Sequence, residues 1–547
     1  MRDLPQLRVV PPGTTVAGVI AFRLPALALF LGLVLLAAGC ATLPEGFERP
    51  TSYALEDTND TILGVATRKR LAEHPDKEAG FRPLSSGIEA LTARAVLAQL
   101  AERSIDAQYY LLHDDLTGWY FIYELLRAAD RGVRVRLLVD DMAIPGRDPQ
   151  IAAFAAHPNI EVRVFNPFSR NAPRTTQYVT RFGSVTRRMH NKSFTVDNQV
   201  TILGGRNIGD EYFEANPAVA YGDMDVILIG PPVHSVSASF DQYWNSDLSY
   251  PISVLFSETP SQADIEIGRE KLAQYIERNR NSAYAEALRT SDLANELRGQ
   301  GELDYFWGDA VVVYDEPGKV AASREKKSLH LLPKLRPFFD RLNSELILIA
   351  AYFVPGRDGT DYLTGLSKRG VRVRILTNSL AATDVTAVHA GYARYRKALL
   401  KAGIELYEMK PTAVTDVERR ERQKKTAGFA GSSKASLHAK SFVLDREEVF
   451  IGSLNLDPRS ANENTEIGVV MDNRRMAEGV ARWFDDNIDR IAYRVKLCGK
   501  EDDCSGLRWY EQRPDGKTRV YDADPHTSLW RRIKVNLLRL LPFESQL

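Results

Sequence analysis

The chain has 547 residues, of which 44% are hydrophobic, and its 71 basic and 71 acidic residues give a formal net charge of zero. A chain of this length exceeds one ordinary hydrophobic core, so two or three folding units are expected. General nucleic-acid binders usually present a basic footprint, so the neutral balance argues against that class without excluding a local basic site.

The first 44 residues have the pattern of an export signal followed by a membrane tether. An uncharged run of 15 residues, 24–38, follows three arginines and has the length of a signal-peptide core rather than of a spanning helix. The run ends in Ala37-Ala38-Gly39-Cys40, which resembles a bacterial lipobox, where the cysteine is lipidated and becomes the new N-terminus. We therefore predict a signal peptide over 1–39, lipid attachment at Cys40 and a tether over 40–80. An uncleaved anchor is the alternative, because no charged residue occurs from Leu24 to Pro44.

Each half of the chain opens with the same β-α-β pattern. Residues 131–140 recur as residues 369–378, and in both copies a glycine ends a helix and alternating valine and arginine begin a strand. An apolar strand and an amphipathic helix precede each copy. The fold class expected from this repeat is α/β, with two related lobes that each contain a mixed sheet flanked by helices. The predicted boundaries are 81–255 for lobe one, 256–325 for a connector, 326–495 for lobe two and 496–547 for a tail.

One motif, H-x-K-x4-D, occurs once in each lobe. The first copy runs from His190 to Asp197 and the second from His438 to Asp445. Each copy is followed by a glycine-rich turn that ends in asparagine, Gly204–Asn207 and Gly452–Asn455. A single copy would be a weak match, but two copies with identical internal spacing are a strong signal.

The residue types in this motif suit chemistry at a phosphate. Imidazole can act as a nucleophile or as a general acid near neutral pH. Lys192 and Lys440 lie two residues further along the same strand face and offer positive charge to phosphate oxygens. The turns could add backbone N–H donors at Gly205 and Ser453, and amide donors at Asn207 and Asn455. Two copies therefore supply a phosphate cradle at the lobe interface and one histidine for each side of an in-line displacement.

Two basic stretches lead directly into the motif strands. Residues 168–189 contain five arginines, including Arg187 and Arg188, and residues 411–436 contain the charged run 418–425. Such runs are often only solvated. The functional alternative is that they flank the mouth of the site and bind anionic headgroups.

The tail contains a cysteine pair and an amphipathic segment. Cys498 and Cys504 enclose a small polar loop, and we predict a disulfide between them, with two free thiols as the alternative. Further on, Trp530, Ile533, Leu537 and Leu541 share one helical face among basic residues. A helix of this kind can lie on a membrane or can pack on its own domain.

At the duplicated motif the chain resembles the phospholipase D superfamily, of which that motif is the signature. The resemblance covers about residues 80–495 and extends to the tail. Within the superfamily the chain is most similar to bacterial cardiolipin synthase C-type proteins. Three phrases support this similarity: Tyr109–Gly118, Tyr352–Gly356 and Leu540–Ser545.

The resemblance implies a two-step mechanism through a phosphohistidine, with neither a cofactor nor a metal ion. Family precedent favours His190 as nucleophile and His438 as acid, although the two motifs are symmetric in sequence. Each histidine should be oriented by a carboxylate downstream of its own motif: Asp225 in lobe one and Glu466 in lobe two, with Asp223 and Glu463 as alternatives. The motif acids Asp197 and Asp445 are expected to hold each lobe together, and His113 with its acidic neighbours is either part of the pocket wall or structural.

The implied function is phosphatidyl transfer that forms cardiolipin at a membrane, with phospholipase D hydrolysis as a side reaction. The expected substrates are phospholipids, phosphatidylglycerol first and phosphatidylethanolamine second. A periplasmic nuclease or other phosphodiesterase on the same site is the alternative, and a catalytically silent lipoprotein scaffold is a third. Both readings of the N-terminus place the mature protein in the cell envelope, on a membrane and facing the periplasm, with the inner or outer membrane left open.

Overall fold

The computed structural model describes residues 42–75, 79–216, 219–300, 303–412, 434–499 and 506–540. The chain divides into two compact units. The smaller unit comprises residues 168–186 and the N-terminal residues up to Glu45, and its described helix is α6 (Arg174–Thr180). The larger unit comprises 46–167 and 187–547 and contains every described strand. Within the described ranges, no helix combines the length and apolarity that crossing a bilayer requires.

Lobe one is built on a nine-stranded mixed sheet with the order β10-β1-β8-β6-β5-β2-β3-β4-β9. Strands β2, β3 and β4 are parallel, and the remaining pairs are antiparallel. The strands are β1 (Ala79–Leu84), β2 (Ser104–Tyr109), β3 (Arg134–Asp140), β4 (Ile160–Phe165), β5 (Ser193–Val196), β6 (Val200–Gly204), β8 (Asp225–Ile229), β9 (Ser249–Pro251) and β10 (Phe306–Gly308).

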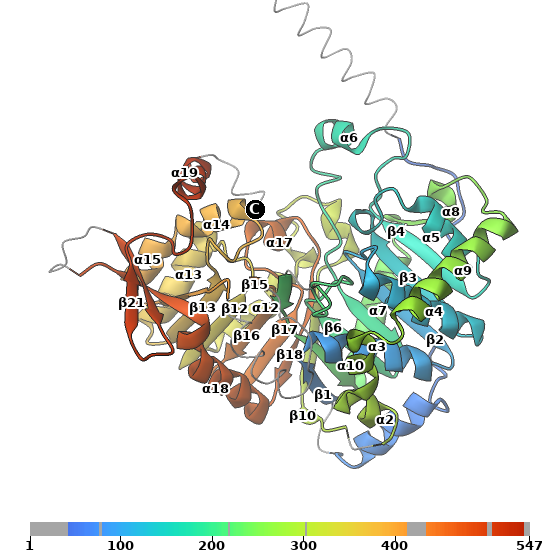
Figure 1. The fold of residues 1–547 in the computed structure, drawn as a ribbon, viewed down its shortest axis with the longest axis horizontal. Helices are drawn as coiled ribbons and strands as arrows, with labels where there is room; N and C mark the ends of the chain where they lie inside the picture. Colours follow the sequence, from blue (N-terminus) through green and yellow to red (C-terminus); the bar gives the residue numbers. More distant parts are fainter. Residues whose placement is uncertain are drawn as a thin grey trace, which may run out of the picture. The chain divides into compact units, whose positions relative to one another are not determined.

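Lobe two is built on a ten-stranded mixed sheet with the order β11-β18-β17-β16-β12-β13-β14-β19-β20-β21. The strands are β11 (Ala310–Tyr314), β12 (Glu345–Ala350), β13 (Arg372–Asn378), β14 (Glu405–Met409), β16 (Lys440–Leu444), β17 (Glu448–Gly452), β18 (Ile467–Asp472), β19 (Ala492–Leu497), β20 (Leu507–Gln512) and β21 (Thr518–Tyr521). A third, two-stranded sheet pairs β7 (Val219–Gly222) of lobe one with β15 (Lys434–Leu437) of lobe two. Figure 1 shows this pair near the centre, between the blue-to-green and the orange-to-red sheets.

The two sheets confirm the predicted repeat and the predicted fold class. The central order β8-β6-β5-β2-β3-β4 of lobe one matches β18-β17-β16-β12-β13-β14 of lobe two. Gly132 and Gly370 follow the helices α4 (Leu116–Asp130) and α13 (Gly356–Lys368) with φ of +94° and +92°. Each glycine therefore closes its helix in the left-handed region, as the sequence pattern predicted.

Helices cover the sheets and connect the strands. In lobe one and the connector they are α2 (Ile62–Ala72), α3 (Gly87–Leu100), α4 (Leu116–Asp130), α5 (Asp148–Ala155), α7 (Pro231–Trp244), α8 (Ile252–Leu255), α9 (Gln262–Asn279), α10 (Ala283–Thr290) and α11 (Asp292–Leu297), with a short 3-10 turn at Asp141–Ala143. In lobe two they are α12 (Leu331–Asp340), α13 (Gly356–Lys368), α14 (Thr386–Ala393), α15 (Arg396–Lys401), α17 (Pro458–Asn462), α18 (Arg474–Ile491) and α19 (Leu529–Leu538), with 3-10 turns at Pro317–Val320 and Lys327–Leu329.

The connector and the tail contribute strands to the sheets as well as linking segments. Strand β10 of the connector pairs with β1, and β11, which follows it directly, pairs with β18 of the other sheet. In the tail, β20 and β21 extend the second sheet beyond β19. Cys498, just after β19, is disulfide-bonded. Its predicted partner Cys504 lies outside the described residues, as does Cys40.

The two sheets share one hydrophobic core. Phe81, Leu203 and Leu228 of lobe one belong to the same buried cluster as Val449 and Val469 of lobe two. Burying both faces against each other removes a large apolar area from water, which joins the lobes and fixes the ends of their strands relative to one another.

Candidate active site

The motif acids close matching hairpin turns and do not face the histidines. Asp197 and Asp445 have φ of +50° and +51° in the turns after β5 and β16. The Asp197 carboxylate accepts hydrogen bonds from the backbone N–H groups of residues 102–104, and the Asp445 carboxylate from those of residues 343–345. Each acid therefore ties its turn to the start of the neighbouring strand, as predicted.

The backbone of each motif histidine forms a hydrogen bond with the backbone of the opposite lobe. The His190 N–H donates to the carbonyl of Thr465 at 2.9 Å, and the His438 N–H donates to the carbonyl of Gly222 at 2.8 Å. The parallel pairing of β7 with β15 and the Met189–Thr465 bridge produce this exchange. The residue after each accepting carbonyl is a carboxylic acid, Glu466 or Asp223.

The orienting carboxylates are therefore exchanged between the lobes. His190 Nδ1 lies 2.8 Å from Glu466 Oε2, and His438 Nδ1 lies 2.5 Å from Asp223 Oδ2. The prediction that each histidine takes a carboxylate from its own lobe is wrong. Asp225, predicted for His190, instead forms a fully buried ion pair with Arg94 at 2.9 Å. The physical reason is the pairing of Asp225 with Gly204 inside the first sheet, which keeps its side chain within lobe one.

Gly205 and Ser453 serve these carboxylates, contrary to the prediction that their N–H groups bind phosphate. Both N–H groups donate within the sheets, to the carbonyls of Met224 and Ile467. A Cβ on Gly205 would lie 2.3 Å from Asp223 Oδ1, so only glycine leaves room for that acid. At the matching position of lobe two, the Ser453 hydroxyl donates to Glu466 Oε2 at 2.5 Å.

Glu466 is held more firmly than Asp223 by neighbouring side chains. The Ser460 hydroxyl donates to Glu466 Oε1 at 2.7 Å, in addition to the bond from Ser453. The backbone N–H of Glu466 donates to Asp315 Oδ2 at 2.8 Å. Asp315 and Ser460 were not predicted from the sequence, because they lie in the connector and in a short helix without any motif of their own.

The two lysines lie against their own histidines and are almost completely buried. The Lys192 ammonium donates to the carbonyl of His190 at 2.6 Å, and the Lys440 ammonium lies 2.8 Å from His438 Nδ1. Burial lowers the pKa of Lys192 to about 7 and also lowers the pKa of Lys440. An anionic phosphodiester beside these groups would restore their positive charge.

Both histidines are predominantly neutral near neutral pH. Burial lowers the pKa of His190 to about 4, against the opposing effect of Glu466, and burial together with Lys440 lowers the pKa of His438. Lys440 also acts on His190, and Lys192 acts on His438. Each motif therefore feels the charge of the other, so the two copies form a single site.

The two turn asparagines differ. The side-chain oxygen of Asn207 accepts from the Leu111 N–H at 3.2 Å, and its amide nitrogen donates to the Tyr212 hydroxyl at 2.9 Å. The side-chain oxygen of Asn455 is buried and has no hydrogen-bond partner among the residues that the structure describes. Asn207 is thus committed to the loops of lobe one, whereas Asn455 keeps bonding capacity for a ligand.

Aromatic rings surround the histidines, and sequence reasoning did not assign them to the site. The Tyr110 ring lies 5.0 Å from His190, edge to face. The Tyr212 ring lies 5.0 Å from His438, and Tyr221 stacks on that imidazole at 5.3 Å. Tyr110 directly follows β2, and Tyr352 follows β12 by two residues. A tyrosine just beyond the first strand of each lobe was a signal that could have identified this ring.

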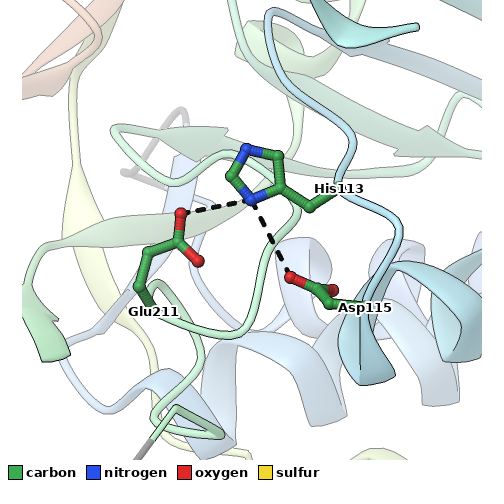
Figure 2. Close-up of side chains that lie close together, drawn as sticks. All are labelled: His113, Asp115 and Glu211. Carbon is green, nitrogen blue, oxygen red and sulfur yellow. Dashed lines mark ion pairs between the residues drawn. The ribbon is translucent and has the colours of Figure 1, made fainter. Parts of the chain in front are cut away.

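His113 belongs to a polar cluster that joins two loops. Figure 2 shows His113 Nδ1 between Glu211, at 3.2 Å, and Asp115, at 3.8 Å. In the part of the chain that the structure describes, this is the only group of three such side chains close enough to share an ion. Both Asp115 oxygens already accept backbone N–H groups, from Gly118 and Asp210. The cluster therefore fits the structural alternative for His113.

The two arginines before the first motif form internal contacts. Arg187 donates to Glu463 Oε2 at 2.6 Å, and Arg188 is buried with its Nε 3.0 Å from Asp140 Oδ2. The expectation that these two side chains bind headgroups is wrong, because their charges are already paired. Residues 168–186 belong to the smaller unit, and 413–433 lie outside the described residues.

The fold and the site define a phospholipase D-type enzyme with two H-x-K motifs in one active site. Residues 96–244 and 339–488 match the family described as cardiolipin synthase, PLD-like domain. The chain belongs to this family.

Individual relatives agree with this assignment. The chain is 40% identical to cardiolipin synthase C of Escherichia coli (strain K12) over 489 residues, which cover 88% of this chain and 99% of that protein. It is 25% identical to cardiolipin synthase A of Pseudomonas entomophila over 421 residues, 76% of this chain and 67% of that one. The crystal structure of phosphatidylserine synthase from Haemophilus influenzae Rd KW20 shares the fold with a TM-score of 0.54 at 12% identity, and the match covers 88% of this chain and all of that chain.

Proposed function

We propose that this protein is a membrane-associated phosphatidyltransferase that forms cardiolipin from two glycerophospholipids, with hydrolysis to phosphatidic acid as a side reaction. The observation that carries the proposal is the pair of buried, neutral histidines, each held at Nδ1 by a carboxylate of the opposite lobe. That contact directs a proton to Nδ1 and leaves Nε2 of each histidine for the chemistry. Nε2 of His438 lies 3.1 Å from the Lys440 ammonium. Membership of the cardiolipin synthase family supports the substrate class.

The proposed reaction has two displacements at phosphorus. In the first, Nε2 of one histidine attacks the phosphodiester, a P–N bond forms, and the P–O bond to the leaving alcohol breaks. The second histidine must carry a proton on Nε2 for this step, and the negative charge of the bound diester favours that imidazolium form. It gives the Nε2 proton to the alcohol and becomes neutral. In the second displacement, the hydroxyl of another lipid attacks the phosphohistidine, a P–O bond forms, and the P–N bond breaks to release the first histidine. The second histidine takes the proton of that hydroxyl and becomes an imidazolium again. Lys192 and Lys440 are the cations we assign to the phosphoryl oxygens, and the Asn455 side-chain N–H group is a further donor that we assign to them.

We assign the nucleophile to His190 and the acid to His438. Glu466 shares its negative charge with two hydroxyl donors, Ser453 and Ser460, so it stabilises a charged imidazolium less strongly. Asp223 receives a backbone N–H from Met224 and has no hydroxyl donor among the described contacts. Its charge acts on both His438 and Lys440. We choose His438 as the proton carrier because fewer hydroxyl donors compete with it for its carboxylate among the described contacts.

An aryl phosphodiester distinguishes the two histidines, because its leaving group departs without a proton. With this substrate, His438→Ala should still accumulate a phosphohistidine at position 190, and His190→Ala should accumulate none. Mass spectrometry of enzyme quenched with denaturant at alkaline pH locates the modification, because the P–N bond hydrolyses in acid. A phosphohistidine at position 438 in the His190→Ala variant would reverse the assignment.

Transfer requires that a lipid hydroxyl outcompete water, which is present at about 55 M. A bound and aligned alcohol can reach effective molarities on the order of 10⁵ M, so transfer is feasible if the acceptor is held in line. Labelled phosphatidylglycerol in vesicles should therefore give cardiolipin in excess over phosphatidic acid. Phosphatidylethanolamine and single-stranded DNA are tested in parallel. Phosphatidic acid as the main product at every acceptor concentration would identify a hydrolase, and cleavage of DNA alone would identify a nuclease.

The proposal includes a location in the cell envelope. The N-terminal pattern supports export and lipid attachment at Cys40, with the catalytic unit facing the periplasm. Phosphatidylglycerol is the donor and acceptor we favour, and phosphatidylethanolamine is the second candidate.

A further inference from the structure

Helix α19 exposes the apolar face that the sequence predicts and packs on its lobe through another face. Val535 is buried against Leu380 and Ala390, with Leu538 packed beside it. Trp530 is 78% exposed and Leu537 is 61% exposed. The other large apolar side chains exposed along this segment are Leu529, Ile533 and Leu540. No other stretch of similar length in the described chain exposes as many, and such patches usually mark a contact with something else.

The Lys, Arg, Asp and Glu residues of this segment are all of one sign. Residues 525–540 contain four cationic side chains, Arg531, Arg532, Lys534 and Arg539, and no acidic residue. A helix that combines exposed tryptophan and leucine with arginine and lysine has the composition of helices that lie in the interface of an anionic bilayer. A soluble acidic partner would explain the cations but would leave the apolar face unaccounted for.

The helix is connected to the margin of the active site. Arg531 donates to the carbonyl of Thr383 at 3.2 Å, at the loop that precedes α14. The next residue, Asp384, accepts a hydrogen bond from the Tyr352 hydroxyl at 2.7 Å. Tyr352 follows β12 by two residues. It lies close enough to Tyr212 and Tyr221, the rings around His438, for those groups to affect its pKa. Figure 1 shows α19 beside α14.

We propose that the exposed face of α19 docks the enzyme on an anionic phospholipid surface and brings the loop 379–385 to the bilayer. The lipid headgroup then reaches His438 along the Tyr352 side of the site. This inference deepens the proposed function, since it names the surface through which lipid substrate is captured. Val385 in the same loop is also exposed, as a contact with the bilayer requires.

The test uses the full chain with Trp530→Ser and Leu537→Ser combined, and Trp483→Ser as the matched control. Trp483 is 49% exposed on α18 and takes no part in the proposed surface. Each protein is assayed on phosphatidylglycerol in vesicles and on a water-soluble aryl phosphodiester. The double variant should lose on the order of tenfold or more of its turnover on vesicles and keep its turnover of the soluble diester. The control should match the wild type on both substrates.

Three outcomes separate this inference from the proposed function. Vesicle turnover of the double variant within about twofold of the wild type overturns the docking of α19. Equal losses on both substrates would show damage to the site and would also overturn it. A wild-type enzyme that cleaves the soluble diester but no phospholipid contradicts the proposed function instead.

A second measurement does not depend on the N-terminal tether. An environment-sensitive dye on Leu537→Cys should shift its emission to the blue on vesicles of phosphatidylglycerol and phosphatidylethanolamine, and shift much less on pure phosphatidylcholine. The same dye on Trp483→Cys should not respond. A blue shift that appears without vesicles and grows with protein concentration would mean that a second copy of the chain covers the helix, and would overturn the membrane assignment.

Discussion

At the scale of single residues, Glu466 and Asp225 occupy similar positions in the sequence of their lobes but have different roles in the structure. Glu466 contacts His190, whereas Asp225 neutralises Arg94 inside lobe one. Glu466 is therefore expected to affect catalysis, and Asp225 is expected to affect the stability of the fold. Substitutions that remove charge but keep shape distinguish these roles.

Glu466→Gln should lower kcat about 10²- to 10⁴-fold with little change in stability, because the amide no longer favours the productive tautomer of His190. Asp225→Asn should leave Arg94 buried without its counter-charge and cost about 3–5 kcal/mol of stability. Steady-state kinetics and thermal unfolding of both variants measure this contrast. A kinetic defect in Asp225→Asn that exceeds that of Glu466→Gln would contradict the assignment.

The buried lysines give the free enzyme an expected pH dependence. The pKa of Lys192 is lowered to about 7, so its ammonium is charged below that pH and loses its proton as the pH rises through it. Values of kcat/KM for an anionic diester should therefore fall above about pH 7. The pKa of His190 is lowered to about 4, so this nucleophile contributes no acidic limb near neutrality.

Lys192→Arg tests the origin of that basic limb. Arginine stays protonated, so the fall in kcat/KM should move to higher pH, whatever the absolute rate of the variant. Profiles on a soluble diester between about pH 5 and pH 10 provide the measurement. If kcat/KM falls at the same pH in both proteins, a group other than Lys192 causes the fall.

At the scale of elements, the turn after β6 depends on the absence of a side chain. A Cβ at position 205 would approach Asp223 Oδ1 to 2.3 Å, so Asp223 would have to shift from the position in which it contacts His438. In lobe two the matching position carries serine, whose hydroxyl bonds to Glu466. The same strand end is thus adapted to a different carboxylate in each lobe.

Gly205→Ala should reduce turnover at least about tenfold by displacing Asp223, with the fold retained. Gly365→Ala on α13 is the matched control, since a Cβ there meets no atom of the described residues within 4 Å. The measurement is kcat for both variants beside their circular dichroism spectra. Unchanged kcat in Gly205→Ala would show that Asp223 can move without cost.

At the scale of the whole molecule, the shared core between the sheets makes the site a property of both lobes together. Each lobe supplies one histidine and the carboxylate for the other, so a separated lobe would lack both complete pairs. The double variant His190→Ala with His438→Ala should consequently be hardly slower than either single variant, because the pair acts as one unit.

The attachment of the molecule to a membrane is tested at its N-terminus. If Cys40 is lipidated, the mature chain should begin at Cys40 and carry acyl groups, and Cys40→Ser should remove them and alter processing. Mass spectrometry of the N-terminal peptide is the measurement. An intact Met1 without acylation would favour the uncleaved anchor.

Much of the fold was predictable because it is encoded locally and twice. The glycines that end α4 and α13, the strand alternation after them and the two H-x-K-x4-D phrases are short-range patterns, and the structure confirms two lobes with matching strand order. The turn function of Asp197 and Asp445 was also predictable, because each bonds to backbone close to its own strand.

The sequence by itself determined the superfamily, the duplicated lobe and the histidines and lysines of the site, because these depend on spacing along one strand. The tertiary structure alone decided which carboxylate orients which histidine. That choice depends on how β7 and β15 pair across the lobes, and strand pairing between distant segments leaves no mark in local sequence. It also decided that Asn207 and Arg188 are used internally, since burial and partner choice arise only when the two sheets close on their common core.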